Sequence, residues 1–123
     1  MTDQNRPINP DDTFFTAYSF LQIACELRAD TAYARTGKSS RSLVKSTALS
    51  MVLMTLNEGA CLKEHHAPTT ATVVVLEGRI NFVSALGSHE LGPLESGIFS
   101  SQLEHEVEAL QESLLLLLIG GKR

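Results

Sequence analysis

The sequence predicts an all-β fold, a sandwich or a barrel, with one α-helix near the N-terminus. Short stretches rich in Val, Leu, Ile, Phe and Thr alternate with turn-forming segments such as TGKSS, NEG, LGS and LGP. No helical pattern lies between these stretches, which favours antiparallel strands over a parallel α/β sheet. Before them, apolar residues recur with the period of a helix.

The helix is expected between Phe14 and Arg28 or Ala29. The apolar residues that mark it recur at intervals of four, three and four, and are Phe14, Tyr18, Leu21 and Cys25. This stripe is widened by Ala17, Ile23 and Ala24, and the residues available to cap the first turn are Asp11, Asp12 and Thr13. An amphipathic helix of this kind must bury its stripe against the rest of the domain or against a second copy.

Eight strands are expected after the helix. Their ranges are Arg41–Thr47, Ala48–Leu56, Ala60–Glu64, Thr70–Leu76, Arg79–Val83, Gly97–Ser101, His105–Leu110 and Leu114–Ile119. Two of the stretches, ALSMVLMTL and LLLLLI, are apolar on both faces, whereas a strand with one wet face should alternate. The helix or a dimer partner covers the second face, or both strands are buried inside one sandwich.

The length of 123 residues and the mass of 13.4 kDa fit one domain. Residues 1–10, with two prolines and no apolar period, are expected to form a flexible lead. Residues 11–40 hold the helix and its connection, and residues 41–123 form the barrel.

Charge and cysteine content exclude several classes of protein. The net charge is −4, the pI is about 5.5, and no block of like charges is present, so a nucleic-acid partner is not expected. The longest apolar run, Leu114–Ile119, is far shorter than the roughly 20 residues of a membrane span. The N-terminus is polar and acidic, unlike a signal peptide, and Cys25 and Cys61 form no CxxC motif. A cytoplasmic protein with free thiols and no membrane partner is therefore expected.

The segment GACLKEHHAPTTATVVVLEG, from Gly59 to Gly78, resembles the first signature of the cupin superfamily. That signature has a glycine, five residues, His-x-His, three or four residues, Glu, six residues and a glycine. Gly59, His65 and Gly78 occupy their slots. Ala67 stands at the second histidine slot and Ala71 at the glutamate slot, and the additional histidine, His66, is one position early.

The second cupin signature begins after fifteen intervening residues and places Leu94 at its first glycine and His105 at its histidine. Its remaining slots are occupied by Ser100, Gln102 and Ala109. The resemblance covers about residues 43–119 and is closest to small single-domain cupins of the conserved-barrel type. It implies an RmlC-like antiparallel jelly-roll β-barrel with an N-terminal α-helix.

The resemblance also implies a metal site, because cupins hold a divalent transition metal with imidazoles and a carboxylate in the barrel lumen. His65 and His105 are the implied ligands of Zn, Ni, Fe or Mn, with His66 as a possible additional ligand. The site is expected to be weak or incomplete unless water, Glu64, Glu104 or another residue completes the shell. If His65 points inward, strand alternation turns His66 outward, and the residues lining the lumen are Ala67, Ala71, Val73 and Val75.

The other polar candidates are given structural roles. His89, in an expected turn, should be solvent-exposed, and Cys61 should be a buried thiol pointing into the barrel. Glu104 and Glu106 should face away from the lumen.

Two functions are compatible with these residues. The first is a small cupin-fold protein that binds a small molecule in its lumen, with a degenerate two-histidine metal site. This hypothesis rests on Ala67 and Ala71, which stand at two of the metal-ligand slots. The alternative is a metal-dependent enzyme, such as a dioxygenase, isomerase or decarboxylase of a small organic substrate. A third class, a domain that only dimerises or senses, is supported by the helix stripe and the doubly apolar strands, which also indicate a homodimer.

Overall fold

The structure is a computed structural model, and it describes residues 7–8, 13–64 and 69–121. Within these ranges the chain forms two helices and nine strands. They are α1 (Phe20–Arg28), α2 (Thr31–Thr36), β1 (Lys38–Lys45), β2 (Leu49–Leu56), β3 (Cys61–Glu64), β4 (Ala71–Glu77), β5 (Ile80–Ser84), β6 (Gly87–Leu91), β7 (Ser96–Phe99), β8 (His105–Ala109) and β9 (Ser113–Gly120).

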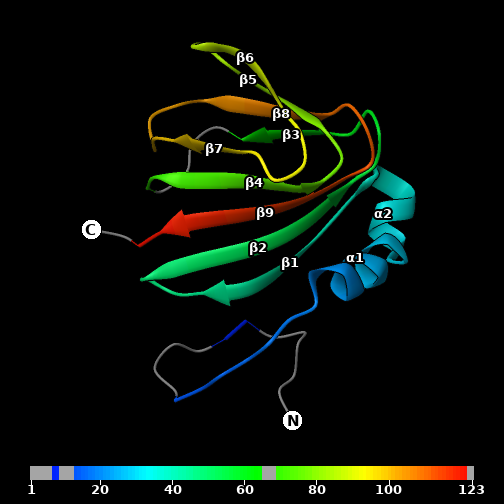
Figure 1. Ribbon diagram of the computed structural model, residues 1–123, viewed down its shortest axis with the longest axis vertical. Coiled ribbons are helices and arrows are strands. Elements are labelled where there is room, and N and C mark those ends of the chain that lie inside the picture. The colour runs from blue at the N-terminus through cyan, green and yellow to red at the C-terminus, as the bar shows by residue number, and fades with distance from the viewer. Residues whose placement is uncertain (1–6, 9–12, 65–68, 122–123) are drawn as a thin grey trace.

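Two antiparallel sheets pack against each other, and both helices lie beside the larger sheet (Figure 1). The larger sheet has the strand order β1-β2-β9-β4-β7, and the smaller sheet has the order β3-β8-β5-β6. Sequence neighbours such as β3 and β4 belong to different sheets, as expected of a jelly roll. The predicted fold class, an antiparallel jelly-roll barrel with an N-terminal helix, is confirmed.

Each of the eight expected stretches contains a strand, but β6 was not expected. Its sequence, GSHEL, is typical of a turn because it has no apolar residue before Leu91. Four of its five residues are exposed, so no inward-facing apolar alternation marks it in the sequence. It forms through backbone pairing with β5, from Ile80–Leu91 to Ser84–Gly87.

The helix α1 begins six residues later than expected and ends where expected. Residues 13–19 form no helix, and Ser19, not Thr13, is the N-cap, because its side chain accepts a hydrogen bond from the Gln22 amide at 3.2 Å. The other expected caps, Asp11 and Asp12, lie outside the described residues. Ser19 and Gln22 have the spacing of a capping box.

The predicted apolar stripe of the helix is wrong in its details. Cys25 is exposed and Leu21 is 60% exposed, but Ile23 and Ala24, which widen the expected stripe, are buried as expected, together with Leu27. The reason is that α1 starts later than expected and leaves Phe14 and Tyr18 outside the helix. Their spacing from Leu21 therefore does not place the three side chains on one helix face. No helix in the described ranges is long and apolar enough to cross a membrane.

The second helix, α2, was not predicted. Asp30 caps its N-terminus by accepting a hydrogen bond from the Ala32 amide, and Gly37 ends it in a left-handed conformation with φ of 75°. The Tyr33 hydroxyl donates a hydrogen bond to Glu112 at 2.9 Å and thereby ties α2 to the turn before β9.

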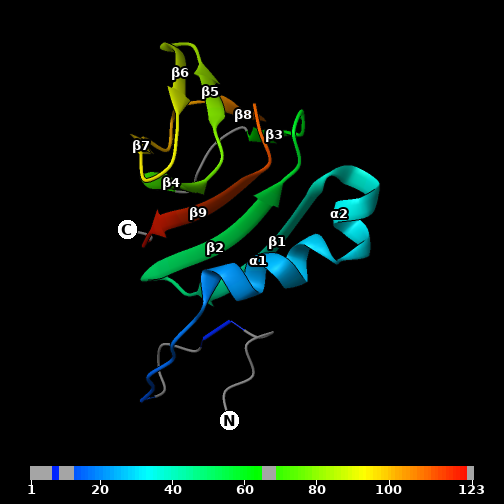
Figure 2. The ribbon, with the colours of Figure 1, turned by 45° about the vertical axis from the view of Figure 1, so that its right-hand side comes forward.

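The two apolar faces of β2 and β9 are both covered. On one face, Leu53 and Leu114 pack with the buried residues of α1, which lies in front of β1 and β2 in Figure 2. On the other face, Leu56 and Leu115 belong to the core between the sheets. The expectation that the helix covers the second face of these strands is therefore confirmed for this part of the sheet.

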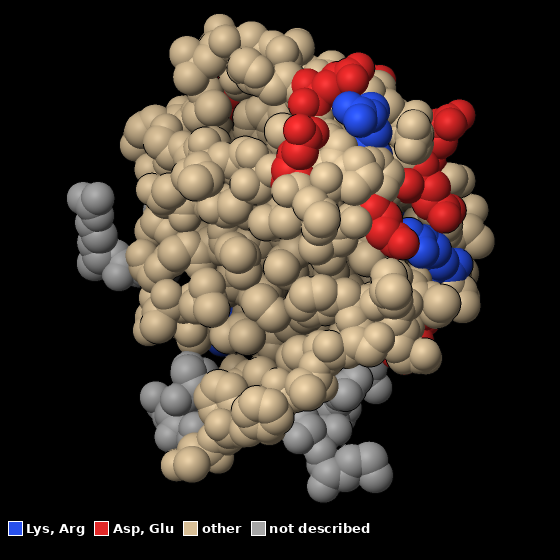
Figure 3. Space-filling view, in the orientation of Figure 1, with Lys and Arg blue, Asp and Glu red and all other residues tan. Residues whose placement is uncertain are grey.

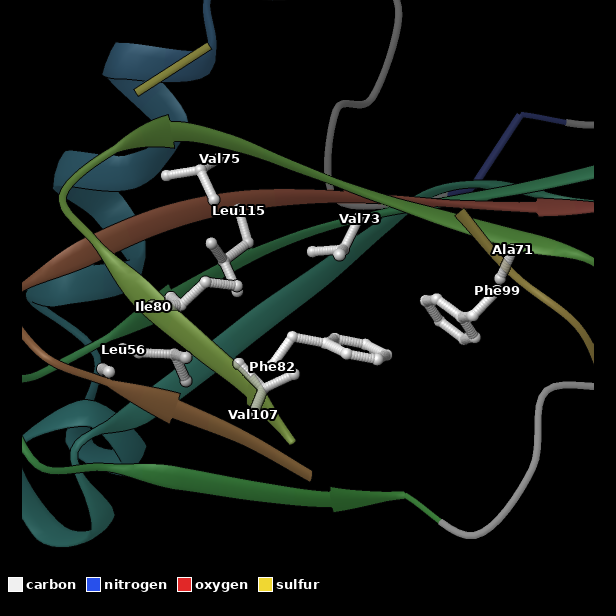
Figure 4. Packing of buried hydrophobic residues seen from close by; sticks show 10 residues of the cluster. Leu56, Ala71, Val73, Val75, Ile80, Phe82, Phe99, Val107 and Leu115 are labelled. Atoms are coloured by element: carbon white, nitrogen blue, oxygen red, sulfur yellow. The ribbon is translucent and has the colours of Figure 1, made fainter. Parts of the chain in front are cut away.

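The inner core is aliphatic at one end and aromatic at the other. Figure 4 shows Val75, Ile80, Leu56 and Leu115 together, with the rings of Phe82 and Phe99 farther along the barrel. The aromatic end is therefore where the barrel interior presents flat, polarisable surfaces to a ligand.

Candidate ligand-binding site

A pocket of about 350 Å³ lies between β6 and β7, which are edge strands of different sheets. Two aromatic rings and several aliphatic side chains form most of its wall. The residues that line it are Phe82, Ser84, Leu86, His89, Glu90, Leu91, Ser96, Gly97, Ile98, Phe99 and Leu103. The pocket therefore opens at an edge where the two sheets separate.

Behind two of these wall residues lies His105, which is only 9% exposed. Its ring stacks on Phe82 at a centroid distance of 5.1 Å and an angle of 11°, and it contacts Phe99 at 4.4 Å. The two phenylalanine rings are 5.2 Å apart. These three side chains, which we call the aromatic cluster, come from β5, β7 and β8.

The hydrogen bonding of His105 fixes its tautomer. Its Nδ1 lies 3.1 Å from the Leu103 carbonyl oxygen. A carbonyl oxygen can only accept, so Nδ1 carries the proton, and in the neutral ring the lone pair is on Nε2.

The structure places three of the expected lumen residues inside the barrel. Ala71, Val73 and Val75 alternate with half-buried residues along β4, and all three belong to the inner core. Ala71 pairs with Phe99 of the aromatic cluster. His65, His66 and Ala67 lie outside the described residues.

Neither a protein-family model nor a curated protein matches the sequence. Solved structures do match. A conserved protein of unknown function from Streptococcus pyogenes, SPY1581, has a TM-score of 0.74 and 18% identity, with 96% of each chain covered. A cupin superfamily protein from Desulfitobacterium hafniense has a TM-score of 0.66 and 14% identity, covering 69% of this chain and 78% of its own. KdgF from a Halomonas species has a TM-score of 0.64 and 19% identity, covering 71% and 82%.

The chain has the cupin fold. Identities below one fifth show the fold and leave the activity open. The cupin glycine slot at Leu94 keeps the geometry of a glycine, because Leu94 has a φ of 65°. The buried Ala71 occupies the slot that carries a glutamate in the cupin signature, and its methyl side chain cannot bind a metal.

Of the expected metal ligands, the described part of the barrel contains His105. Over residues 7–8, 13–64 and 69–121, no group of three or more His, Cys, Asp or Glu side chains is placed to hold a metal. His105 supplies one imidazole, and protein metal sites of this class need three or four ligands. Glu64 pairs with His105 in the backbone register of β3 and β8.

The expected orientation of Cys61 is wrong. Cys61 pairs with Glu108 and is only half-buried, whereas the next residue, Leu62, pairs with the buried Val107. Alternation therefore turns Cys61 to the outer side of β3. Glu104 is exposed and Glu106 is half-buried.

Sequence reasoning missed most of the pocket. His89 is exposed as expected, but it lies in β6 opposite Phe82 and lines the pocket. Phe82 and Phe99 were not singled out. The alternation of Ile80 and Phe82 within the expected strand Arg79–Val83 was an available signal for Phe82, whereas nothing local indicates that Phe99 meets it.

Proposed function

We propose that this cupin-fold protein binds a small, uncharged and largely apolar molecule in the pocket between β6 and β7. The observation that carries the proposal is that the pocket walls Phe82 and Phe99 are the rings that pack on the buried His105. A wall held from behind in this way is preformed, so little ordering opposes binding. The volume of about 350 Å³ is within the range of small-molecule sites.

The chemistry of the lining supports an uncharged ligand. None of the described residues that line the pocket is Lys or Arg, and its carboxylate, on Glu90, lies 3.4 Å from the Arg79 guanidinium. A buried carboxylate or phosphate on a ligand would find no Lys or Arg among these described lining residues, and burial of a charge without a strong partner is costly. Ser84, Ser96 and His89 offer hydrogen bonds to a hydroxyl or amide.

Filling the pocket from its wall tests the proposal. Gly97 lines the pocket, and a Cβ there would meet Leu91 at 3.4 Å, which is an ordinary contact. We expect saturable binding of 4-methylphenol to the wild type by calorimetry. Gly97→Val should bind it at least about tenfold more weakly, which corresponds to a loss of about 1.4 kcal/mol in binding free energy.

The matched control is Gly120→Val. Gly120 is also a strand glycine, its Cβ would also meet a first neighbour at 3.4 Å, and it lies outside the pocket. The control should bind like the wild type. Equal weakening by both variants, or no saturable binding to the wild type, would overturn the proposal.

The second candidate is a metal-dependent enzyme acting on a small organic substrate, such as a dioxygenase, isomerase or decarboxylase. One observation favours it: the Leu103 carbonyl holds Nδ1 of His105, which is how proteins orient a histidine whose Nε2 binds metal. His65 and, as an additional ligand, His66 would have to complete the set.

Metal analysis tests this candidate. Protein reloaded with Zn, Ni, Fe or Mn should retain close to one equivalent after desalting, and His105→Ala should lose it. Less than about one-tenth of an equivalent in the wild type would exclude this candidate, because a resident metal centre binds its ion tightly enough to stay filled during desalting.

The proposed location is the cytoplasm. Both cysteines are free in the structure, which is the state that a reducing compartment maintains. A small-molecule ligand and a second copy of the chain are the partners proposed, with neither nucleic acid nor membrane among them.

A further inference from the structure

A second pocket lies at the other edge of the barrel. It has a volume of about 280 Å³ and lies beside β1 and β3, the remaining edge strands of the two sheets, and beside the start of α2. Its polar lining residues are Asp30, Lys38, Ser39, Ser40 and Thr55. Unlike the described lining of the pocket between β6 and β7, this lining carries a lysine, and it carries a carboxylate as well.

Lys38 brings the positive charge from the β3 side of the second pocket. It is the first residue of β1, and its Nζ donates a hydrogen bond to the Cys61 carbonyl oxygen of β3 at 2.9 Å. An ammonium group has three N–H donors, so this contact orients the group without using all of them. Among the residues that the structure describes, no carboxylate forms an ion pair with Lys38. Its charge is therefore available to an anionic group in the pocket.

Asp30 brings the negative charge from the α2 side. Its two oxygens accept hydrogen bonds from the Ala32 amide at 3.4 Å and from the Ser39 hydroxyl at 3.5 Å. Ser39 is buried, and its carbonyl oxygen accepts a hydrogen bond from the fully buried Thr55 hydroxyl. Both contacts of Asp30 are long, and a carboxylate has about four lone-pair sites, so Asp30 can still accept from a ligand.

The two charges reach the second pocket from opposite sides of β1. Lys38 and Ser39 are adjacent in this strand, so their side chains leave it on opposite faces. One contacts β3, and the other contacts Asp30 at α2. The half-buried apolar side chains of Met54 and Leu62 belong to the same lining. A ligand that pairs with both charges therefore needs apolar atoms between its own charged groups.

The surroundings of the second pocket favour neither sign of charge alone. Figure 3 shows Lys or Arg and Asp or Glu side chains next to one another on the right-hand side of the molecule, where α2 lies in Figure 1. A ligand with a single charge would be attracted by one of the two lining charges and repelled by the other. A ligand with both charges pairs with each of them.

We propose that the second pocket binds a small amino acid in which a short methylene chain separates the carboxylate from the ammonium group. Lys38 binds the carboxylate, Asp30 binds the ammonium group, and Met54 and Leu62 contact the chain. The volume is near the lower end of the range for small-molecule sites, which suits a ligand of this size. The site shares no lining residue with the pocket between β6 and β7.

Calorimetry with four ligands that have the same six-carbon chain tests the proposal. We expect saturable binding of 6-aminohexanoate to the wild type, with a dissociation constant of about 1 mM or lower. Hexanoate and hexylamine each lack one charged group and should bind at least about tenfold more weakly. 2-Aminohexanoate carries both groups on one carbon atom and should also bind at least about tenfold more weakly.

Two outcomes with the wild type would overturn the site. The first is the absence of saturable 6-aminohexanoate binding, and the second is equal affinity for a ligand that carries only one of the charges. Equal affinity for 2-aminohexanoate would overturn the separation of the two charges.

Two substitutions test the charged partners. Lys38→Met and Asp30→Asn each remove one charge, and Asn is as good a helix cap as Asp. Each should weaken the binding of 6-aminohexanoate at least about tenfold. In Asp30→Asn, hexanoate should bind as tightly as 6-aminohexanoate, because the ammonium group has lost its partner. The matched control is Lys45→Met, at the other end of β1, exposed and outside the pocket, which should bind like the wild type.

Thermal melting of each variant shows whether it is folded, and the comparison of ligands on the wild type does not depend on the variants. Equal weakening by Lys38→Met and Lys45→Met would overturn the role of Lys38. Gly97→Val should leave the binding of 6-aminohexanoate unchanged, and Lys38→Met should leave the binding of 4-methylphenol unchanged. Loss of 6-aminohexanoate binding in Gly97→Val but not in Lys38→Met would place this ligand between β6 and β7 and overturn the second site.

Discussion

His105 illustrates how far single residues could be predicted. Its position in the second cupin signature selects it from the sequence, but its contacts with Phe82 and Phe99 involve strands up to 23 positions apart in the chain. No local pattern contains such a contact, because it depends on how β5, β7 and β8 meet when the barrel closes. The residue was predictable, and its aromatic surroundings were not.

Leu94 is a position where the backbone conformation and the residue type disagree. Its φ of 65° costs a residue with a Cβ roughly 1–2 kcal/mol, and its side chain is 83% exposed, so it regains little by burial. Leu94→Gly should raise the free energy of unfolding by up to about 1 kcal/mol, since the larger entropy of glycine in the unfolded chain offsets part of the relief. Denaturant unfolding measures this change.

Gly78→Ala is the matching control, because it adds a Cβ at a left-handed position instead of removing one. Gly78 has a φ of 89°, and a Cβ there would collide with the Glu112 backbone oxygen and with Ser113. This variant should be clearly less stable than the wild type. A Leu94→Gly protein that is less stable than the wild type would show that the left-handed conformation at Leu94 is not strained.

At the level of the element, the strands were predictable because short stretches rich in β-branched and aliphatic residues stand between turn-forming segments. In β4, ATVVVLE, the buried residues Ala71, Val73 and Val75 alternate with less buried ones, but this alternation does not appear in the residue types. The first half of the expected helix was wrong because Phe14 and Tyr18 happened to fit a helical interval, whereas residues 13–19 are rich in Thr and aromatic residues, which are weak helix formers.

The start of α1 can be tested by removing the cap. Ser19→Ala should lower the free energy of unfolding by about 1 kcal/mol, because the amide of Gln22 loses its acceptor. Thr13→Ala, at the cap that the sequence suggested, should leave stability unchanged within about 0.5 kcal/mol, as for an ordinary surface substitution. The reverse order of effects, measured by denaturant unfolding, would place the helix start at Thr13.

For the whole molecule, the antiparallel barrel followed from the number and spacing of the strands, and the solved structure of SPY1581 matches this fold over 96% of both chains. The pocket did not follow from the sequence. It depends on β6 and β7 being the free edges of two different sheets, and β6 has no apolar alternation to mark it.

The central claim is that the aromatic cluster walls a binding site, and NMR of the wild-type protein with 4-methylphenol tests it most directly. Nuclear Overhauser effects from the ligand methyl group to the Phe82 and Phe99 ring protons are predicted, with amide shifts concentrated at Gly97 and Ile98. Saturable binding with contacts elsewhere on the protein, or shifts that do not saturate at these residues, would contradict it.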